Sequence, residues 1–99
     1  MDSNSNAINK IDKEKISSLN FAPADVLTTS ADQLQRKIDL QRASALGASS
    51  KANVKIYFID DKGITYRTEA TVWASTEKNV TLKGEVLIPI RAITKVGFF

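Results

Sequence analysis

The chain has 99 residues, 42% hydrophobic and 25% charged, which fits one small globular domain and excludes a disordered or membrane-embedded chain. It has no cysteine, hence no disulfide framework or thiolate metal site, and no apolar run near the ~18 residues of a membrane-spanning helix. The net charge of +3 lies wholly in residues 51–99, where eight Lys and Arg face five Asp and Glu. This excess hints at an anionic partner. Together with a polar N-terminus that lacks the apolar core of a signal peptide, the composition predicts a cytoplasmic protein without membrane contact.

Residues 1–20 are rich in Asn, Ser, Lys and Asp, with few apolar residues between them, and Phe21-Ala-Pro-Ala24 is interpreted as a connector. The apolar spacing of residues 1–20 is too sparse for a firm helix and indicates a flexible lead or a frayed helix. Residues 1–29 are therefore expected to form a polar, flexible lead ahead of a single domain that spans residues 30–99.

The spacing predicts a helix over residues 30–46. Ser30 is a favourable N-cap, Gln33 can complete a capping box, and Gly47 suits a left-handed stop. The expected apolar stripe is narrow, which places the helix on the rim of the following domain, and it consists of Leu34, Ile38, Arg42 and Ala45.

From Asn53 onward the hydrophobic period changes to two, the pattern of β-strands. Asp60-Asp-Lys-Gly63 reads as a hairpin turn, so Asp60 and Asp61 are interpreted as turn residues and not as a catalytic pair. Five short strands joined by tight turns predict a mainly β fold, with a strongly bent antiparallel barrel over residues 53–98. The strands are expected at about 54–59, 64–72, 79–83, 85–90 and 93–98.

Two aromatic residues do not follow the alternation. Trp73 falls on the polar face of its strand, so either a bulge turns it inward or it is exposed to a partner. Tyr57 also lies opposite the main apolar face. Apolar residues on both strand faces, and the edge strands of an open barrel, favour a homo-oligomer.

Catalysis is not expected. The chain has no histidine, which excludes Ser-His-Asp chemistry and histidine metal sites, and its four scattered glycines form no phosphate-binding loop. No cofactor or metal is predicted. Binding chemistry centres on two loops, which carry Lys78 and Asn79 in one and Arg91 in the other, although each could equally be an ordinary turn residue.

These loops carry a family resemblance. Lys78-Asn-Val-Thr-Leu82 is similar to the Sm1 signature, and Ile90-Arg-Ala-Ile-Thr-Lys-Val96 resembles the Ile-Arg-Gly of the Sm2 motif. Val54-Lys-Ile-Tyr-Phe58 with Gly63 also resembles the first strand and hairpin of Hfq. Over about residues 30–98 the chain therefore resembles the Sm/LSm family and its bacterial relative Hfq.

The resemblance implies an Sm-like, SH3-like barrel that assembles into a homo-oligomeric ring of about five to seven subunits. It further implies that Lys78, Asn79 and Arg91 line a pore for single-stranded RNA, with DNA as an alternative, in RNA processing or chaperoning. Trp73 or Tyr57 would stack a base or form an interface. The competing hypothesis is an SH3-like protein-interaction or structural oligomerisation module that binds no nucleic acid.

Overall fold

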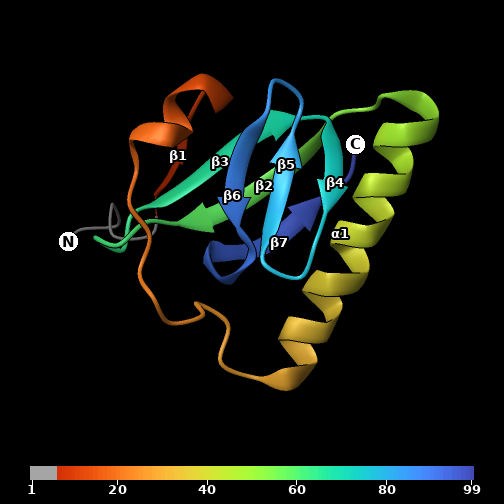
Figure 1. Cartoon of the computed structure of the whole chain (residues 1–99). Coiled ribbons are helices and arrows are strands. Elements are labelled where there is room, and N and C mark those ends of the chain that lie inside the picture. The colour runs from red at the N-terminus through yellow and green to blue at the C-terminus, as the bar shows by residue number, and fades with distance from the viewer. Residues whose placement is uncertain (1–6) are drawn as a thin grey trace.

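The computed structural model describes residues 7–99, which fold into seven strands in two sheets, with one α-helix (Figure 1). The first sheet has the order β1 (Ile8–Lys10), β3 (Thr65–Ala70), β2 (Val54–Ile59) and β7 (Ile93–Gly97). The second sheet has the order β4 (Val72–Ser75), β5 (Asn79–Leu82) and β6 (Val86–Pro89). No helix in the described part of the chain is long and apolar enough to cross a membrane. The prediction of a mainly β chain with one helix is confirmed.

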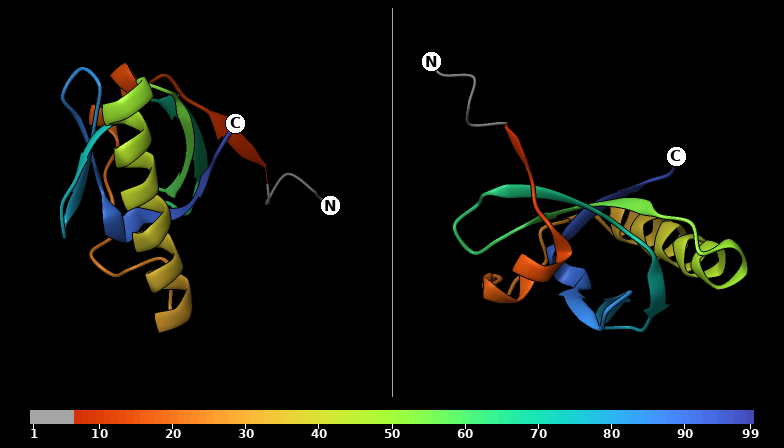
Figure 2. Two further views of the ribbon diagram at one scale, coloured as in Figure 1. Left: turned by 90° about the vertical axis from the view of Figure 1, so that its right-hand side faces the viewer. Right: turned by 90° about the horizontal axis from the view of Figure 1, so that it is seen from above.

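The hydrophobic core lies between the two sheets. Figure 2 shows from above that the sheets face one another, with α1 at one side and the short N-terminal 3₁₀ helix at the other. β3 runs into β4 through the single residue Thr71, so the chain passes directly from one sheet to the other. The largest fully buried side chains come from every layer and include Phe58, Ile16, Leu40, Ile56, Leu82, Ile88 and Ile93. Packing of both sheets on one core accounts for the apolar alternation of the strands.

The predicted strand positions agree with the structure to within a few residues, except that the second predicted strand is divided at Thr71 into β3 and β4. The hairpin interpretation of Asp60 is confirmed. Its carboxylate accepts hydrogen bonds from the backbone N–H groups of Lys62 and Ile64, both at 2.9 Å. Tyr66 donates its hydroxyl to the same carboxylate at 3.3 Å, and burial followed by the charge of Asp60 raises the pKa of Tyr66.

Helix α1 extends over Ser30–Ser50 and is longer than predicted. Its N-cap is Thr29 and not Ser30, because the Thr29 hydroxyl accepts the backbone N–H of Asp32 at 3.2 Å. The side chain of Gln33 does not close a capping box; it donates to the carbonyl oxygen of Leu27 at 2.8 Å. The helix ends at Ser50, and its C-cap Lys51 has the left-handed conformation with φ of 56°.

The buried face of α1 is not the predicted one. Leu34 and Ile38 are 58% and 48% exposed. The helix instead packs through a stripe at helical spacing that consists of Arg36, Leu40, Ala43 and Gly47. A Cβ on Gly47 would overlap the carbonyl oxygen of Val72 on β4, so Gly47 is the point of closest approach between helix and sheet, and not the predicted helix stop. Leu40 and Ala43 enter the core, so α1 does more than cover a rim.

The N-terminal segment differs from the expected flexible lead. Within residues 7–29, β1 pairs in parallel with β3, and a 3₁₀ helix, η2 (Lys13–Ser18), follows it. Ile16 on η2 is 1% exposed and belongs to the core. Asp61 donates its backbone N–H to the carbonyl oxygen of Asn20 at 2.9 Å. Residues 7–29 are therefore an integral part of the domain, and residues 1–6 lie outside the described part of the chain.

Trp73 occupies a bulge, as one of its two interpretations requires, but the bulge does not turn it inward. The pairing of β4 with β5 shifts between Val72 and Ala74, which leaves Trp73 as the extra residue. Its side chain is 52% exposed. The inward interpretation of Trp73 is therefore wrong.

A buried hydroxyl in β3 gives a prediction for stability. Thr68 is 1% exposed, and among the described residues its Oγ1 has no hydrogen-bond partner. Thr68→Val should therefore raise the free energy of unfolding by about 1 kcal/mol, because the isosteric side chain removes an unsatisfied polar atom. Chemical denaturation measures the change. Thr65→Val, at a half-buried position of the same strand, should stay within about 0.5 kcal/mol of the parent protein. A loss of stability in Thr68→Val would mean that the hydroxyl has a partner.

Candidate functional site

The three predicted site residues Lys78, Asn79 and Arg91 line one open pocket with a volume of about 300 Å³. Two backbone interactions bring their loops together. The N–H of Ile90 donates to the carbonyl oxygen of Lys78 at 2.9 Å, and Asn79 is paired with Pro89 at the end of β6. The β4–β5 turn is thus held against η3 (Ile90–Ala92), the 3₁₀ turn that carries Arg91.

Thr76 fixes the turn that presents Lys78 and Asn79. Its Oγ1 accepts the backbone N–H groups of Lys78 at 3.3 Å and of Asn79 at 3.2 Å. Its own N–H and hydroxyl donate to the carbonyl oxygen of Asn79 at 2.9 and 3.1 Å. The backbone of the turn is therefore satisfied internally, and the Lys78 side chain is exposed.

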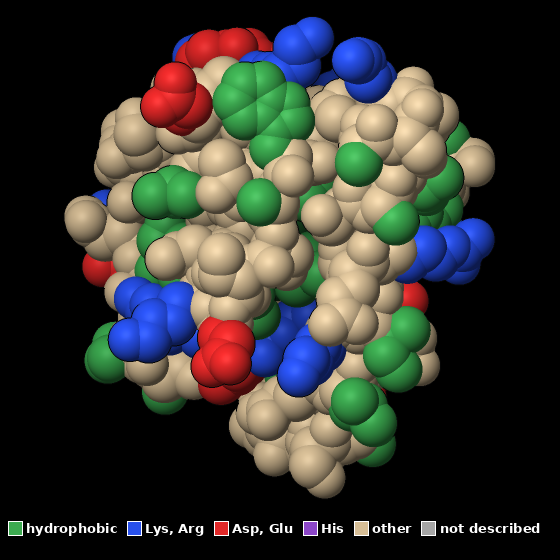
Figure 3. All heavy atoms as spheres, turned by 45° about the vertical axis from the view of Figure 1, so that its right-hand side comes forward, with side chains coloured by type: hydrophobic (Ala, Val, Ile, Leu, Met, Phe, Trp, Pro, Cys, Tyr) green, Lys and Arg blue, Asp and Glu red, His purple; other side chains and the backbone are tan. Residues whose placement is uncertain are grey.

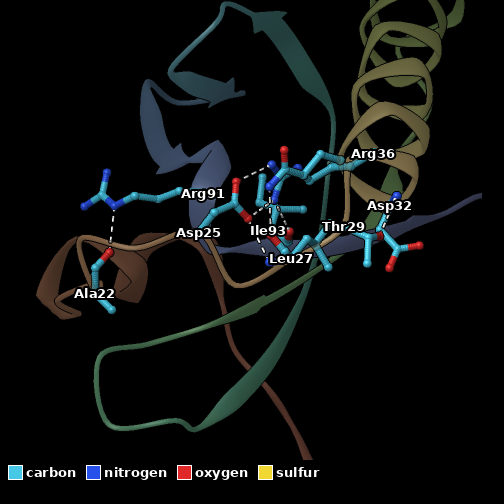
Figure 4. A network of polar contacts seen from close by, with 9 residues as sticks. Ala22, Asp25, Leu27, Thr29, Asp32, Arg36, Arg91 and Ile93 are labelled. Carbon is cyan, nitrogen blue, oxygen red and sulfur yellow. Dashed lines mark hydrogen bonds and ion pairs between the residues drawn. The ribbon is translucent and has the colours of Figure 1, made fainter.

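Arg91 lies on the opposite wall of the pocket. Its Nε donates to the carbonyl oxygen of Ala22 at 2.7 Å, and its own carbonyl oxygen accepts the N–H of Val26 at 2.8 Å. Figure 4 shows the guanidinium extending away from Arg36 toward Ala22. The residue is exposed, so the terminal N–H groups of the guanidinium remain accessible to an anion.

A partly buried ion pair, which the sequence did not indicate, also lines the pocket. Arg36 is 6% exposed, and its two terminal nitrogens donate to the two carboxylate oxygens of Asp25 at 2.9 and 2.7 Å (Figure 4). The same guanidinium donates to the carbonyl oxygen of Ile93 at 2.9 Å, and the N–H of Leu27 donates to Asp25 at 2.8 Å. The hydrogen bonds from Arg36 lower the pKa of the Asp25 carboxyl, against the opposing effect of burial. Asp25 is therefore ionised at neutral pH and is neutralised by Arg36.

A second, larger pocket of about 610 Å³ continues from the first between α1 and the β4–β5 turn. The two pockets share Arg36, Glu77 and Ile90. Figure 3 shows basic and acidic side chains gathered around this hollow beside the lower half of the helix. Gln33 and Lys37 contribute polar groups from α1. We call the two connected pockets the α1–β4/β5 groove.

The groove can bind an anion but offers only a small excess of positive charge. Since Asp25 and Arg36 neutralise one another, the 300 Å³ pocket retains the cations Lys78 and Arg91 against Glu77. Among residues 7–99 no group of three or more His, Cys, Asp or Glu side chains could hold a metal ion. One such pocket suits weak binding of a polar ligand, such as a phosphate group that lies beside the Asn79 amide.

The two aromatic candidates lie elsewhere. Neither Trp73 nor Tyr57 lines the pocket that holds Lys78, Asn79 and Arg91. Tyr57 is on β2, where the Lys95 Nζ lies 4.6 Å from the centroid of its ring.

Comparison of the chain with protein-family models, with curated proteins and with solved structures finds no match. A function for this chain therefore rests on the geometry and charge of its surfaces.

Proposed function

We propose that the chain is an Sm-like, ring-forming protein that binds single-stranded nucleic acid, most simply RNA, through the α1–β4/β5 groove. The observation that carries the proposal is the convergence of Lys78, Asn79 and Arg91 on one pocket. These residues come from two loops, and each supplies a group suited to nucleic acid: an ammonium or a guanidinium for phosphate, and an amide for a base edge. The expected role is RNA processing or chaperoning in the cytoplasm.

The strand connectivity supports the Sm-like barrel in this proposal. β2, β3 with β4, β5 and β6 pair in succession as antiparallel neighbours, and β7 returns to pair with β2. The short η3 turn joins β6 to β7. In this reading β3 and β4 are the two halves of one bent strand, with Thr71 at the bend, and α1 precedes the five strands of the barrel.

A ring would compensate for the weakness of each pocket. Among the described strands, β6 pairs only with β5 and β7 pairs only with β2, so each presents a second edge. Pairing of β6 in one subunit with β7 in the next would satisfy both edges, on the parts of β6 and β7 that η2 and α1 do not cover. About five to seven copies of a pocket with a small cation excess would then act together on one strand of RNA.

Arg91→Ala tests the site. Because a phosphate contact is lost, we expect this variant to bind a fluorescein-labelled oligouridylate more weakly than the parent does. Fluorescence anisotropy measures the affinity. The slope of log affinity against log salt should fall by about 0.7 for each lost contact. Lys62→Ala, in the exposed β2–β3 turn, is the matched control and should bind as the parent does. An unchanged affinity and slope in Arg91→Ala would remove Arg91 from the site.

Asn79→Ala separates base reading from phosphate contact. The substitution removes an amide without changing charge, so it should reduce the preference among homopolymers more than the overall affinity. Anisotropy titrations with uridylate and adenylate oligomers measure both quantities. An equal loss for every homopolymer would contradict a base-reading role.

The competing function is an SH3-like protein-interaction or structural oligomerisation module that binds no nucleic acid. Exposed apolar side chains on α1 and on the second sheet favour it, namely Leu34, Ile38, Trp73 and Leu87. A salt titration separates the two functions, because phosphate contacts weaken steeply with ionic strength and an apolar interface does so much less.

A further inference from the structure

The outer face of the first sheet carries a row of four side chains across its four strands, with three cations, on β1, β3 and β7, and a tyrosine on β2. The register pairs Lys10 with Arg67, Arg67 with Tyr57, and Tyr57 with Lys95. Residues directly opposite one another in a sheet share a face, so these four side chains lie side by side. At ~4.8 Å between strands, the row extends over about 14 Å. The next row adds Lys55, which is paired with Glu69 on one side and with Gly97 on the other.

Among residues 7–99 no helix packs over this face, on which Lys10 and Lys95 are exposed while Tyr57 and Arg67 are half-buried. The face is strongly basic. Helix α1 packs mainly on β4 and β7, while η2 packs on β6 and β3 beside the core, so neither lies over the outer side chains of β2. In these two rows of paired residues, the described chain places Lys10, Lys55, Arg67 and Lys95 against the single carboxylate of Glu69, an excess as large as the net charge of the whole chain. Within residues 7–99 the only ion pair of these cations joins Arg67 to Glu69, at 3.8 Å. Like charges on directly opposed strands cost stability, so an external anion would stabilise this arrangement.

Aromatic rings are interleaved with the cations. The Lys95 Nζ lies 4.6 Å from the ring centroid of Tyr57, and the Lys55 Nζ lies at the same distance from that of Phe99. Phe99 is exposed, and Tyr57 is half-buried at the centre of the cation row. Cations that hold phosphates beside rings that stack on bases are the combination by which proteins bind single-stranded nucleic acid. An acidic protein segment would use the cations but would have no such use for flat rings.

We propose that this outer face, which we call the β2 face, is a second binding surface for single-stranded nucleic acid, with Lys55, Arg67 and Lys95 contacting phosphates and Tyr57 stacking on a base. The β2 face lies on a different sheet from the turn that holds Lys78 and Asn79, and it shares no residue with the groove. It therefore goes beyond the groove site and can be tested separately from it.

The test compares three double variants of the full chain for binding of a labelled oligothymidylate and a labelled oligouridylate by anisotropy over a range of salt. Lys55→Gln/Lys95→Gln neutralises the β2 face, and Lys78→Gln/Arg91→Gln neutralises the groove. Lys15→Gln/Lys83→Gln removes the same charge from exposed positions on η2 and on the β5–β6 turn. Loss of two phosphate contacts should lower the salt slope of the β2-face variant by about 1.4 and leave the control unchanged. In the parent protein, NMR amide shifts at Tyr57 and Lys95 should move on titration with the same oligomer.

Each outcome assigns or removes one surface. A weakened β2-face variant with an intact control supports the β2 face, whether or not the groove variant is also weakened. If the β2-face variant binds as the parent does, and the amide shifts of Tyr57 and Lys95 do not move on titration, the proposal for the β2 face is wrong. The proposal for the groove is not affected by that result. Equal weakening of all three variants would mean general charge attraction, and no binding by the parent would overturn both sites. Binding of phosphatidylserine vesicles through Lys55 and Lys95, without binding of either oligomer, would replace nucleic acid by a membrane surface and contradict the proposal.

Discussion

Replacing Gly47 with alanine is expected to destabilise the protein by about 2–3 kcal/mol, although alanine is the better helix former. The added Cβ would overlap the Val72 carbonyl oxygen and would lie 3.3 Å from the Thr71 Cγ2 atom. Val72 is fully buried, so the strand cannot retreat without disturbing the core. The helix would have to move away from β4 and would lose its close packing there. Urea or thermal denaturation measures the loss.

The sign of this effect distinguishes packing from helix propensity. At an exposed interior position, glycine is about 1 kcal/mol less favourable than alanine, so Ala45→Gly in the same helix is the matched control and should cost about that much. If Gly47→Ala instead stabilised the protein, α1 would not approach β4 as closely as the structure shows.

Arg36→Met is expected to cost about 3 kcal/mol, because it leaves the Asp25 carboxylate without its partner and the buried carbonyl of Ile93 without a donor. Asp25→Asn should cost less, since the amide oxygen can still accept the N–H of Leu27 and one bond from Arg36. When Asp25→Asn is already present, Arg36→Met should lower the free energy of unfolding by less than it does in the parent protein, because no carboxylate is left unpaired. Additive losses would show that the two side chains are not coupled.

Acidity gives an independent measure of the same pair. The folded-state pKa of Asp25 lies below its ordinary value of 3.8, with the Arg36 hydrogen bond as the largest cause. Its contribution to stability is therefore complete above the unfolded-state pKa and is lost as the pH falls through the lowered folded-state pKa. The difference in unfolding free energy between the parent and Asp25→Asn should be largest above about pH 5 and should shrink below pH 4. A difference that does not change with pH would contradict an ionised, paired Asp25.

The strands could be predicted because apolar residues alternate with polar ones along them, and this alternation follows directly from which side chains are buried. Val54, Ile56 and Phe58 alternate toward the core, as their spacing indicates. The helix face could not be predicted in the same way. The apolar Leu34 and Ile38 stay exposed because close packing on β4 needs the small side chains of Ala43 and Gly47, and hydropathy does not record size.

The candidate site was also predictable only in part. Lys78 and Arg91 lie in turns and Asn79 is the first residue of β5, so the local sequence pattern could indicate them. Arg36 and Asp25 meet across the helix and the preceding connector, and the β2 face depends on strand register. Such contacts are set by tertiary packing, which one sequence does not display. For the same reason Ile16, alone among polar neighbours, could not be recognised as a core residue.

Native mass spectrometry of the full chain with a short oligouridylate shows whether the protein forms a ring that binds one strand of nucleic acid. We expect a single assembly of about five to seven chains that carries one oligonucleotide, and we expect the assembly to release the RNA but keep its subunits as the salt concentration is raised. A monomer that carries no RNA at any salt concentration would contradict the ring and the groove together and would favour the SH3-like interaction module.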